Sequence, residues 1–471
     1  MESDQLCRGN GMRKSISLIL ATSVLCSVCS FGCGGQPAVP QYAQKQLRLS
    51  GFWSPYEQTE ESYTLYKNAG LNTLLMGNHS VDEWSSETLD YLGSAHTLKS
   101  LQLCRRVGLD AVLQYGDWYC ESSEGKAMES TPFSSRNFYA EYKDIIAAVH
   151  IADEPSVETM DKYGDDALTA DYKGVYDVPY MVNLFPNYAS TLALGVNRYD
   201  EYLAAYEEKI LADFPQNAMV SVDFYPYQKS VDGLHYSWLL CYEKVAKLAK
   251  KNNATTHFYL QAATTAEFQN ELTEKDMRLQ AYVALCYGAD WLSYYCYAMP
   301  RSRKLDGSFA EMYEKCMLDV NDQPTSLYTA VKNVNVELQG FAPAFLAYDW
   351  VKTVGLTDNA QNNGNLAINM LWEEVDFTDR KTLSSVTANG DCIVGCFERE
   401  EDEAYMLVNY SLPADEKEIE ATLTLNKKWG YVAIYGGENS TGAPQIMRAD
   451  GKGKCKIPLK AGEGKFVVPL E

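Results

Sequence analysis

Two carboxylic acids in this chain directly follow short apolar runs that are typical of β-strands. Glu154 stands in the segment HIADEPS, and Asp223 stands in the segment SVDFYPY. Cleavage of a glycosidic bond needs one carboxylic acid to protonate the leaving oxygen and a second carboxylate to act as nucleophile or to activate water. Glu154, as general acid, and Asp223, as second carboxylate, are the best pair in this sequence for that chemistry.

Polar and aromatic residues follow the other predicted strands. Amide groups, a histidine and aromatic rings suit a neutral, polyhydroxylated ligand, because they bond hydroxyl groups and pack on the apolar faces of sugars. They are accompanied by no cluster of Lys or Arg, so a phosphate ligand is not expected. The candidates for binding the ligand are Trp53, His79, Asp117, Trp118, Asn183, Tyr225, Gln261 and Tyr295.

Several of these candidates have a purely structural alternative. The tetrapeptide Asp-Glu-Pro-Ser around Glu154 could simply open a helix, because acidic residues favour the first turn and Pro its first position. Asp223 could bond loop amides. The side chains of His79, Asn183 and Gln261 could equally belong to buried hydrogen-bond networks.

The segments that must position these residues alternate between short apolar runs and longer helical stretches. Three helical stretches end in Gly70, Gly108 and Gly288 directly before a strand, where glycine supplies a left-handed helix cap. The predicted strands span residues 47–53, 71–77, 109–116, 145–153, 179–185, 218–227, 256–262 and 289–297.

Eight such β/α units in about 300 residues predict a (β/α)8 TIM barrel. Active sites of this fold lie at the carboxyl ends of the strands, which is where Glu154 and Asp223 stand. A doubly wound open sheet is the alternative, but no GxGxxG motif follows the first strand. We therefore expect the barrel.

The sequence changes character after the last predicted barrel helix. Short alternating strands separated by Asn, Asp, Gly and Pro turns predict a C-terminal antiparallel β-sandwich, with a long loop over 355–385. At 471 residues the chain exceeds what one hydrophobic core usually supports. The predicted parts are a signal peptide and tether over 1–40, a barrel over 41–347 and a β-sandwich domain over 348–471.

The N-terminal forty residues read as a targeting segment. Arg13 and Lys14 precede the apolar run SISLILATSVLCSVCSFG, which indicates a signal peptide. The stretch around Cys33 resembles a bacterial lipobox, which implies a lipid on Cys33 and anchoring to a membrane; cleavage near Ala38 without a lipid is the alternative. Both predict an extracytoplasmic protein, either a cell-surface lipoprotein or a secreted one.

Composition narrows the class of partner. The formal net charge of −22 repels phosphate backbones, so nucleic acid is not an expected partner. The cysteines show no repeated CxxC motif, and acidic and His residues are not spaced as metal ligands. We therefore expect no metal, no other cofactor and no disulfide framework.

The segments HIADEPS and RLQAYVALCYGADWLSYYCY resemble the clan of retaining (β/α)8-barrel glycoside hydrolases that includes the family 42 β-galactosidases. The resemblance covers roughly residues 47–345, together with the arrangement of the C-terminal β-domain. In that clan an Asn-Glu-Pro motif on strand four carries the acid/base, which implies this role for Glu154, with Asp153 in place of Asn. The clan's nucleophile is a Glu on strand seven, where this sequence has Gln261.

Gln cannot act as that nucleophile, which leaves three alternatives. Asp223 takes the role of second carboxylate, Glu267 reaches in from the following loop, or the protein binds a glycan without cleaving it. Because Asp223 is two strands from Glu154, their carboxyl groups could be roughly 6.5–9.5 Å apart, which admits water and gives inversion. The sequence thus predicts a glycosidase for a neutral glycan, with a non-catalytic, cell-surface glycan-binding lipoprotein as the alternative.

Overall fold

The computed structural model describes residues 37–76, 89–114, 141–163, 177–214, 217–267, 272–304, 309–357, 366–371, 374–437, 440 and 442–471. The segment Pro37–Glu471 forms one compact unit. The predicted signal peptide up to residue 36, including Cys33, lies outside the described residues, as do His79, Asp117 and Trp118. Among the described helices, none combines the length and the apolar character that crossing a membrane requires.

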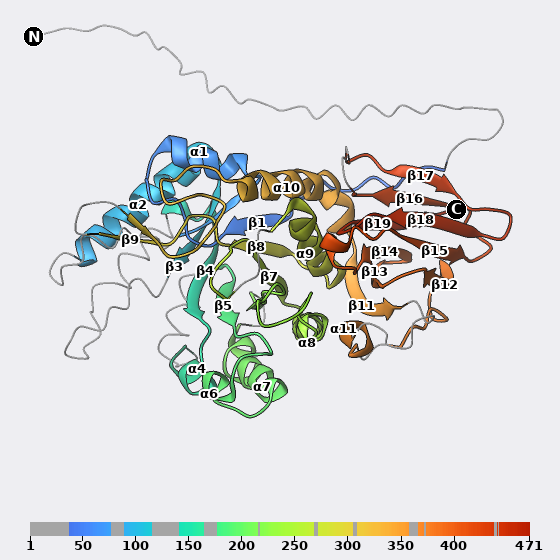
Figure 1. Ribbon diagram of the computed structural model, residues 1–471, viewed down its shortest axis with the longest axis horizontal. Helices are drawn as coiled ribbons and strands as arrows, with labels where there is room; N and C mark the ends of the chain where they lie inside the picture. The colour runs from blue at the N-terminus through green and yellow to red at the C-terminus, as the bar shows by residue number, and fades with distance from the viewer. Residues whose placement is uncertain are drawn as a thin grey trace, which may run out of the picture. The chain divides into compact units, whose positions relative to one another are not determined.

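The first part of this unit is a closed barrel of eight parallel strands in sequential order (Figure 1). Strand β8 closes the barrel by pairing with β1, with Arg48 opposite Trp291. Each strand overlaps one of the eight predicted segments, so the predicted TIM barrel is confirmed. The strands are β1 (Arg48–Gly51), β2 (Thr73–Leu75), β3 (Asp110–Gln114), β4 (Ile146–Asp153), β5 (Tyr180–Leu184), β6 (Met219–Asp223), β7 (Thr255–Gln261) and β8 (Trp291–Tyr295).

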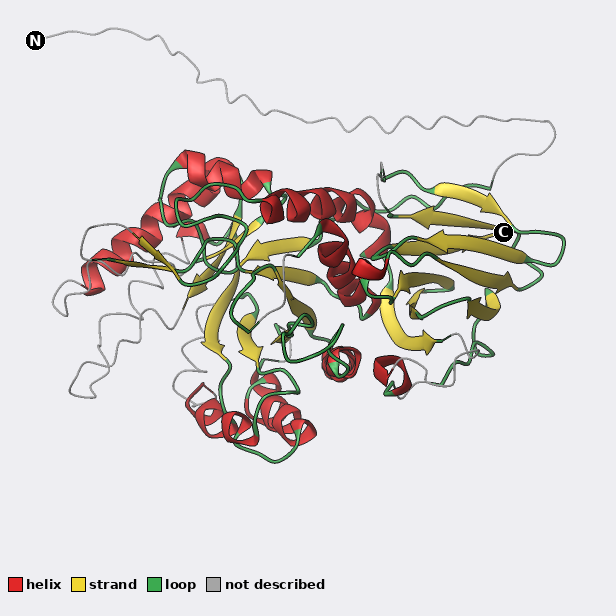
Figure 2. Cartoon of the chain, viewed as in Figure 1, coloured by secondary structure: helices red, strands yellow, loops and turns green. Residues whose placement is uncertain are grey.

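Helices connect these strands (Figure 2). The predicted glycine caps are confirmed, because Gly70, Gly108 and Gly288 have φ angles of 80°, 79° and 74°. This left-handed conformation costs glycine little and turns the chain from helix to strand. The main helices are α1 (Glu60–Asn68), α2 (Leu89–Val107), α4 (Val157–Tyr163), α6 (Thr191–Leu194), α7 (Tyr199–Lys209), α8 (Trp238–Lys251), α9 (Glu274–Cys286) and α10 (Ser326–Phe345).

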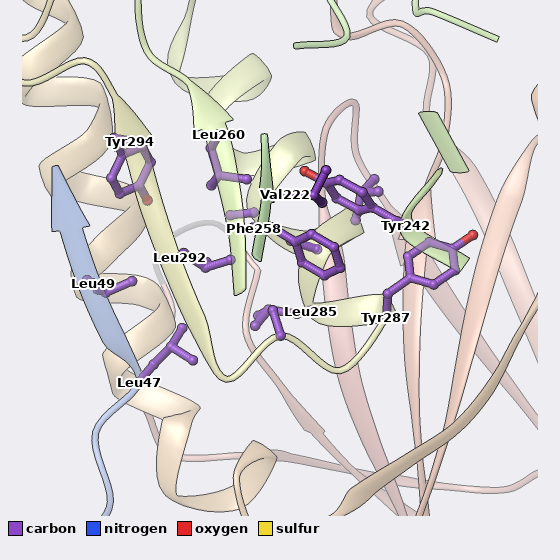
Figure 3. Close-up of a cluster of buried hydrophobic side chains, with 14 of the residues drawn as sticks. Leu47, Leu49, Val222, Tyr242, Phe258, Leu260, Leu285, Tyr287, Leu292 and Tyr294 are labelled. Atoms are coloured by element: carbon purple, nitrogen blue, oxygen red, sulfur yellow. The ribbon is translucent and has the colours of Figure 1, made fainter. Parts of the chain in front are cut away.

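The barrel strands are buried on both faces, as parallel strands must be when helices cover them. On β7, Phe258 and Leu260 face outward into the main core, where Phe258 stacks on Tyr242 of α8 at 3.8 Å between ring centroids (Figure 3). The alternate residues His257 and Tyr259 belong to the inner face, and Tyr259 is in the cluster that fills the barrel. Strict alternation along β7 therefore separates residues that pack the fold from residues available to a site.

Two antiparallel sheets follow the barrel, which confirms the predicted C-terminal β-architecture. One sheet has the order β11-β13-β14-β19-β16-β17 and the other the order β12-β15-β18. Their strands are β11 (Asp349–Leu356), β12 (Leu383–Ala388), β13 (Cys392–Arg399), β14 (Asp402–Asn409), β15 (Ile419–Leu425), β16 (Tyr431–Tyr435), β17 (Gln445–Arg448), β18 (Lys454–Leu459) and β19 (Gly464–Leu470).

Some elements of this part were not predicted. The loop expected over 355–385 contains helix α11 (Leu366–Asn369), and β12 begins within it. Strand β18 alternates exposed and buried residues, but its sequence KCKIPL is too short and too charged to stand out. The division between barrel and β-domain near residue 347 stays a prediction.

Helix α9 links the barrel to the C-terminal sheets. It contacts β7 on one side and β13, β14 and β19 on the other, and all residues from Asp276 to Cys286 are buried. Its buried Arg278 donates to Glu337 of α10 at 3.0 Å, and Tyr282 donates to the other oxygen of Glu337 at 2.6 Å. The buried guanidinium of Arg278 is therefore paired and hydrogen-bonded, and these bonds join α9 to α10 directly before β8.

Candidate active site

A cavity of about 660 Å³ opens at the carboxyl ends of the barrel strands, a volume in the range of small-ligand sites. Residues from β4, β5, β6, β7 and β8 and from the following loops line it. They are Phe52, Asp153, Glu154, Asn183, Phe185, Pro186, Tyr188, Ala189, Ser190, Ala193, Asp223, Tyr225, Tyr259, Thr265, Ala266, Glu267, Tyr295, Met312 and Tyr313.

Two consecutive carboxylic acids, Asp153 and Glu154, enter the cavity from the end of β4. Successive side chains of a strand normally point to opposite faces. Glu154 breaks this alternation, because its φ of 47° places it in the left-handed region while its N–H still bonds the carbonyl of Asn183 at 2.8 Å. That conformation costs a non-glycine residue about 1–2 kcal/mol, and here it accompanies the entry of both carboxyl groups into one site.

The helix that follows is capped by a different residue. The Ser156 hydroxyl accepts the N–H of Thr159 at 3.3 Å, and the Ser156 carbonyl accepts the N–H of Met160 at 2.9 Å. These are the bonds of an N-cap. Capping of α4 therefore does not account for Glu154, whose side chain lines the cavity.

Asn183 of β5 brings the carboxylates of β4 and β6 together. Its Nδ2 donates to Oδ1 of Asp153 at 3.0 Å and to Oδ1 of Asp223 at 3.2 Å. The two oxygens are therefore at most about 6 Å apart. Three carboxylic acids, counting Glu154, thus share one end of the barrel.

Burial and mutual repulsion raise the pKa values of two carboxyl groups in this cluster, so that these groups keep their protons to higher pH. Burial, followed by the negative charge of Asp153, raises the pKa of Glu154 from 4.5 to about 7. Burial also raises the pKa of Asp223 well above its ordinary value, followed by the charges of Glu154 and Asp153, while the bond from Asn183 acts in the opposite direction. Because like charges this close cannot all ionise easily, the site carries a carboxylic acid near neutral pH.

Aromatic rings form a wall of the cavity. Phe52 lies after β1, and its ring centroid is 5.5 Å from that of Tyr295 and 6.0 Å from that of Tyr259. Tyr225 lies 5.3 Å from Tyr295. The hydroxyl of Tyr295 also hydrogen-bonds the hydroxyl of Tyr313. Such a wall combines apolar ring faces with polar edges, as a sugar ring requires.

Not every residue predicted to bind the ligand lies at this cavity. Trp53 packs beside Cys296 and Met299, and it is not among the lining residues. Gln261 is fully buried: its Oε1 accepts the N–H of Tyr227 at 3.1 Å and its Nε2 donates to the Tyr227 carbonyl at 3.2 Å. Gln261 therefore ties β7 to the loop after β6, and it lies outside the cavity lining.

The structure does bring Asn183, Tyr225 and Tyr295 to the cavity with Glu154 and Asp223, and it places exposed Glu267 on the lining. Phe52 and Tyr259 were not predicted, although each lies two residues after a buried polar strand residue, Ser50 and His257 respectively. Strand alternation could have identified them.

Strand alternation could not have identified Tyr313, which also lines the cavity. It follows the short hairpin of β9 (Arg301–Arg303) and β10 (Phe309–Glu311), and only the fold brings this segment back to β8. The sequence predicts no separate role for Asp153 beside Glu154, because residue order does not show that Asp153 and Asp223 share the amide of Asn183.

No model of a known protein family matches the chain, and no curated protein matches it. Among solved structures, a protein described as a glycoside hydrolase is similar over 92% of this chain and 93% of its own, with a TM-score of 0.51 and 12% identity. A family 5 glycoside hydrolase from Bacteroides vulgatus gives a TM-score of 0.47 at 10% identity, covering 90% of this chain and 89% of its own.

A family 30 endoxylanase from Clostridium papyrosolvens gives a TM-score of 0.42 at 9% identity over 91% of this chain and 98% of its own. These identities are low, so the comparison bears on architecture. The chain shares the fold of a solved glycoside hydrolase over 92% of its length.

Proposed function

We propose that this chain is a glycoside hydrolase that cleaves O-glycosidic bonds of a neutral glycan. The observation that carries the proposal is the convergence of Glu154 and Asp223 in one aromatic-walled cavity at the carboxyl ends of the barrel strands. The two environments differ, because Glu154 is partly exposed whereas Asp223 is buried and bonded to Asn183. A pair of carboxyl groups in unequal surroundings is suited to act as acid and base.

Glu154 is the general acid in this proposal. Its pKa of about 7 keeps it protonated in weakly acidic and near-neutral solution, so that it can give its proton to the leaving glycosidic oxygen. Asp223 is the second carboxylate, and the N–H of Asn183 stabilises its charged form. The aromatic wall of Phe52 and Tyr295 positions the sugar ring between them.

We further propose that the reaction inverts the anomeric centre, with Asp223 activating a water molecule. Strands β4 and β6 are separated by β5, so their backbones are roughly 9–10 Å apart at a strand spacing of about 4.8 Å, and the side chain of Asn183 draws Asp153 rather than Glu154 toward Asp223. An inverting pair needs room for that water, with about 6.5–9.5 Å between carboxyl groups. Proton NMR of fresh hydrolysis products tests this, and retention of configuration would contradict it.

One observation favours a second candidate, a glycan-binding protein without catalysis. The surroundings of Asp223 favour its neutral form, which cannot activate water, and β7 contributes Tyr259 to the cavity rather than a carboxylate. A protein of this kind would bind the same sugars through the same aromatic wall.

The deciding experiment measures both cleavage and binding on a panel of neutral polysaccharides and oligosaccharides. Release of reducing ends by the wild type, lost in Glu154→Gln while calorimetric glycan affinity remains, supports the hydrolase. Wild-type binding without any release across the panel supports the binding protein instead.

We also propose that the chain is exported and anchored through a lipid on Cys33, as the N-terminal sequence suggests. Metabolic labelling with a fatty acid tests this, since label should enter the wild type and not Cys33→Ala. Labelling of neither protein would favour secretion without an anchor.

A further inference from the structure

A continuous row of polar side chains crosses the inside of the barrel beneath the carboxylates. It contains the Ser50, Ser221, His257 and Ser293 side chains, each 0% exposed. His257 is at its centre, with Nδ1 2.8 Å from Oγ of Ser221 and Nε2 2.7 Å from Oγ of Ser293. Branched apolar side chains usually dominate the interior of such a barrel, so a row of this kind is unusual there.

The groups at both ends of the row have fixed roles as hydrogen-bond donors or acceptors. At one end the indole N–H of Trp291, which can only donate, bonds Oγ of Ser50 at 2.8 Å, and Ser50 bonds Ser293. At the other end Ser221 donates to Oδ1 of Asn183 at 3.0 Å. The Asn183 amide nitrogen then gives its two hydrogens to the carboxylates of Asp153 and Asp223.

The donors and acceptors at the two ends of the row determine which atom carries each hydrogen between them. The nitrogen of Asn183 faces both carboxyl groups, which in their ionised forms can only accept hydrogen bonds, and its oxygen faces Ser221. Ser221 donates its single hydrogen to that oxygen, so its own oxygen must accept the hydrogen bond from Nδ1–H of His257. A neutral imidazole has one N–H, so Nε2 accepts the hydrogen of Ser293, which in turn accepts from Ser50.

We propose that His257, held as the Nδ1–H tautomer, is a positioning residue that keeps the amide nitrogen of Asn183 turned toward Asp153 and Asp223. If the ring lost its Nδ1 donor, Ser221 would no longer be compelled to give its hydrogen to Asn183. The amide could then turn its oxygen toward the carboxylates and destabilise their charged forms. The catalytic consequence rests on the proposed function, whereas the tautomer does not.

The surroundings support a ring that stays neutral. Burial lowers the pKa of His257 to about 3, with a smaller effect in the same direction from His150. Its other neighbours are the rings of Tyr259 at 4.7 Å and Trp291 at 5.4 Å between centroids. Neither carries a charge near neutral pH, so the ring keeps a single proton.

The first test is 15N NMR of the full-length wild-type chain labelled at its five histidines. The His257 signals are identified by their absence from the spectrum of His257→Asn. We expect a protonated Nδ1 and an unprotonated Nε2 whose shifts do not change between pH 5 and pH 8. The opposite tautomer, or titration within that range, would overturn the proposal whether or not the protein cleaves a glycan.

The second test is the pH dependence of kcat/KM in two variants. His257→Phe keeps an aromatic ring but has no donor, so the acidic limb, set by ionisation of Asp223, should move up by about one pH unit. His257→Asn places an amide donor near the position of Nδ1 and should restore the wild-type limb. Other ionisable groups near Asp223 include the carboxyls of Asp153 and Glu154, the hydroxyls of Tyr188, Tyr199, Tyr202, Tyr225, Tyr242 and Tyr259 and the thiol of Cys241, all kept in both variants.

If His257→Phe folds and the acidic limb of its pH profile lies at the same pH as in the wild type, the His257 ring has only a structural role. If His257→Phe does not fold, Ser221→Ala breaks the same row one bond further along and should give the same shift. Correct tautomers in a protein that cleaves nothing would refute the proposed hydrolase and leave the hydrogen-bond assignment standing.

Discussion

The side-chain nitrogen of Asn183 donates to Oδ1 of Asp223 at 3.2 Å, so a residue of β5 orients a carboxylate at the end of β6. This bond opposes the effect of burial, because it favours the charged carboxylate that burial disfavours. The charge state of Asp223 therefore depends on a residue of a neighbouring strand as well as on its own burial.

Asn183→Ala should lower kcat/KM by about 10–100-fold, since a hydrogen bond to a charged group contributes about 1.5–3 kcal/mol. The pKa of Asp223 should rise at the same time, and the acidic limb of the pH profile should move upward. Asn187→Ala is the matched control, because Asn187 bonds Ser237 and does not line the cavity. Steady-state kinetics across pH 4–9 measure both effects, and equal activity of the two variants would argue against a role for Asn183.

Glu154→Gln should lower turnover by about 10²–10⁴-fold on substrates with a poor leaving group. The loss should be much smaller on aryl glycosides with acidic phenols, which leave without a proton. Glu158→Gln, an exposed acid on the first turn of α4, is the control and should behave as the wild type. If the loss were the same for every leaving group, Glu154 would not be the general acid.

The pH dependence of activity should follow the ionisation of Glu154. Because its acidic form is the active one, kcat/KM should fall as pH rises through about 7, the pKa to which burial and Asp153 raise this group. A basic limb that stayed in place in Asp153→Asn would contradict the contribution of Asp153, since removal of that negative charge should lower the pKa of Glu154 and move the limb to lower pH.

The same ionisation predicts a change in stability. The pKa of Glu154 is 4.5 ordinarily and about 7 in the folded chain, so the folded protein binds this proton more tightly than the unfolded protein does. The stabilisation is present below about pH 4.5 and is lost as pH rises through 7. At pH 8 the free energy of unfolding of Glu154→Gln should therefore exceed that of the wild type by about 1–3 kcal/mol, as measured by denaturant unfolding. At pH 4 the two proteins should be about equally stable. A less stable variant at pH 8 would reverse the sign of this prediction.

Gly288→Ala tests the junction between the barrel and the C-terminal sheets. Gly288 has a φ of 74°, and an added Cβ would lie 2.5 Å from Cβ of Trp350. Strain of about 1–2 kcal/mol and overpacking of about 1–3 kcal/mol should add. Gly233→Ala has a φ of 82° with nothing within 4 Å of the added carbon, so it reports the strain alone. Denaturant melts compare the two, and equal losses would mean that the contact with Trp350 relaxes freely.

Residue order is enough to predict the barrel and the strand ends at which its candidate site lies. Apolar runs, helical periods and the caps at Gly70, Gly108 and Gly288 are local features, so they predict strands and helices without knowledge of the fold. The sequence also placed Glu154 and Asp223 at strand ends, because the strand limits of β4 and β6 follow from the same pattern.

The contacts among those residues follow from the folded arrangement of the strands. Closure of the barrel sets β5 between β4 and β6, which allows Asn183 to bond Asp153 and Asp223 at once. It also directs Gln261 into a bond with Tyr227 and leaves Tyr259 to face the cavity. These relationships join residues 30 or more positions apart. Hydrogen bonds and shared protons depend on distances of a few ångströms, which residue order along the chain does not specify.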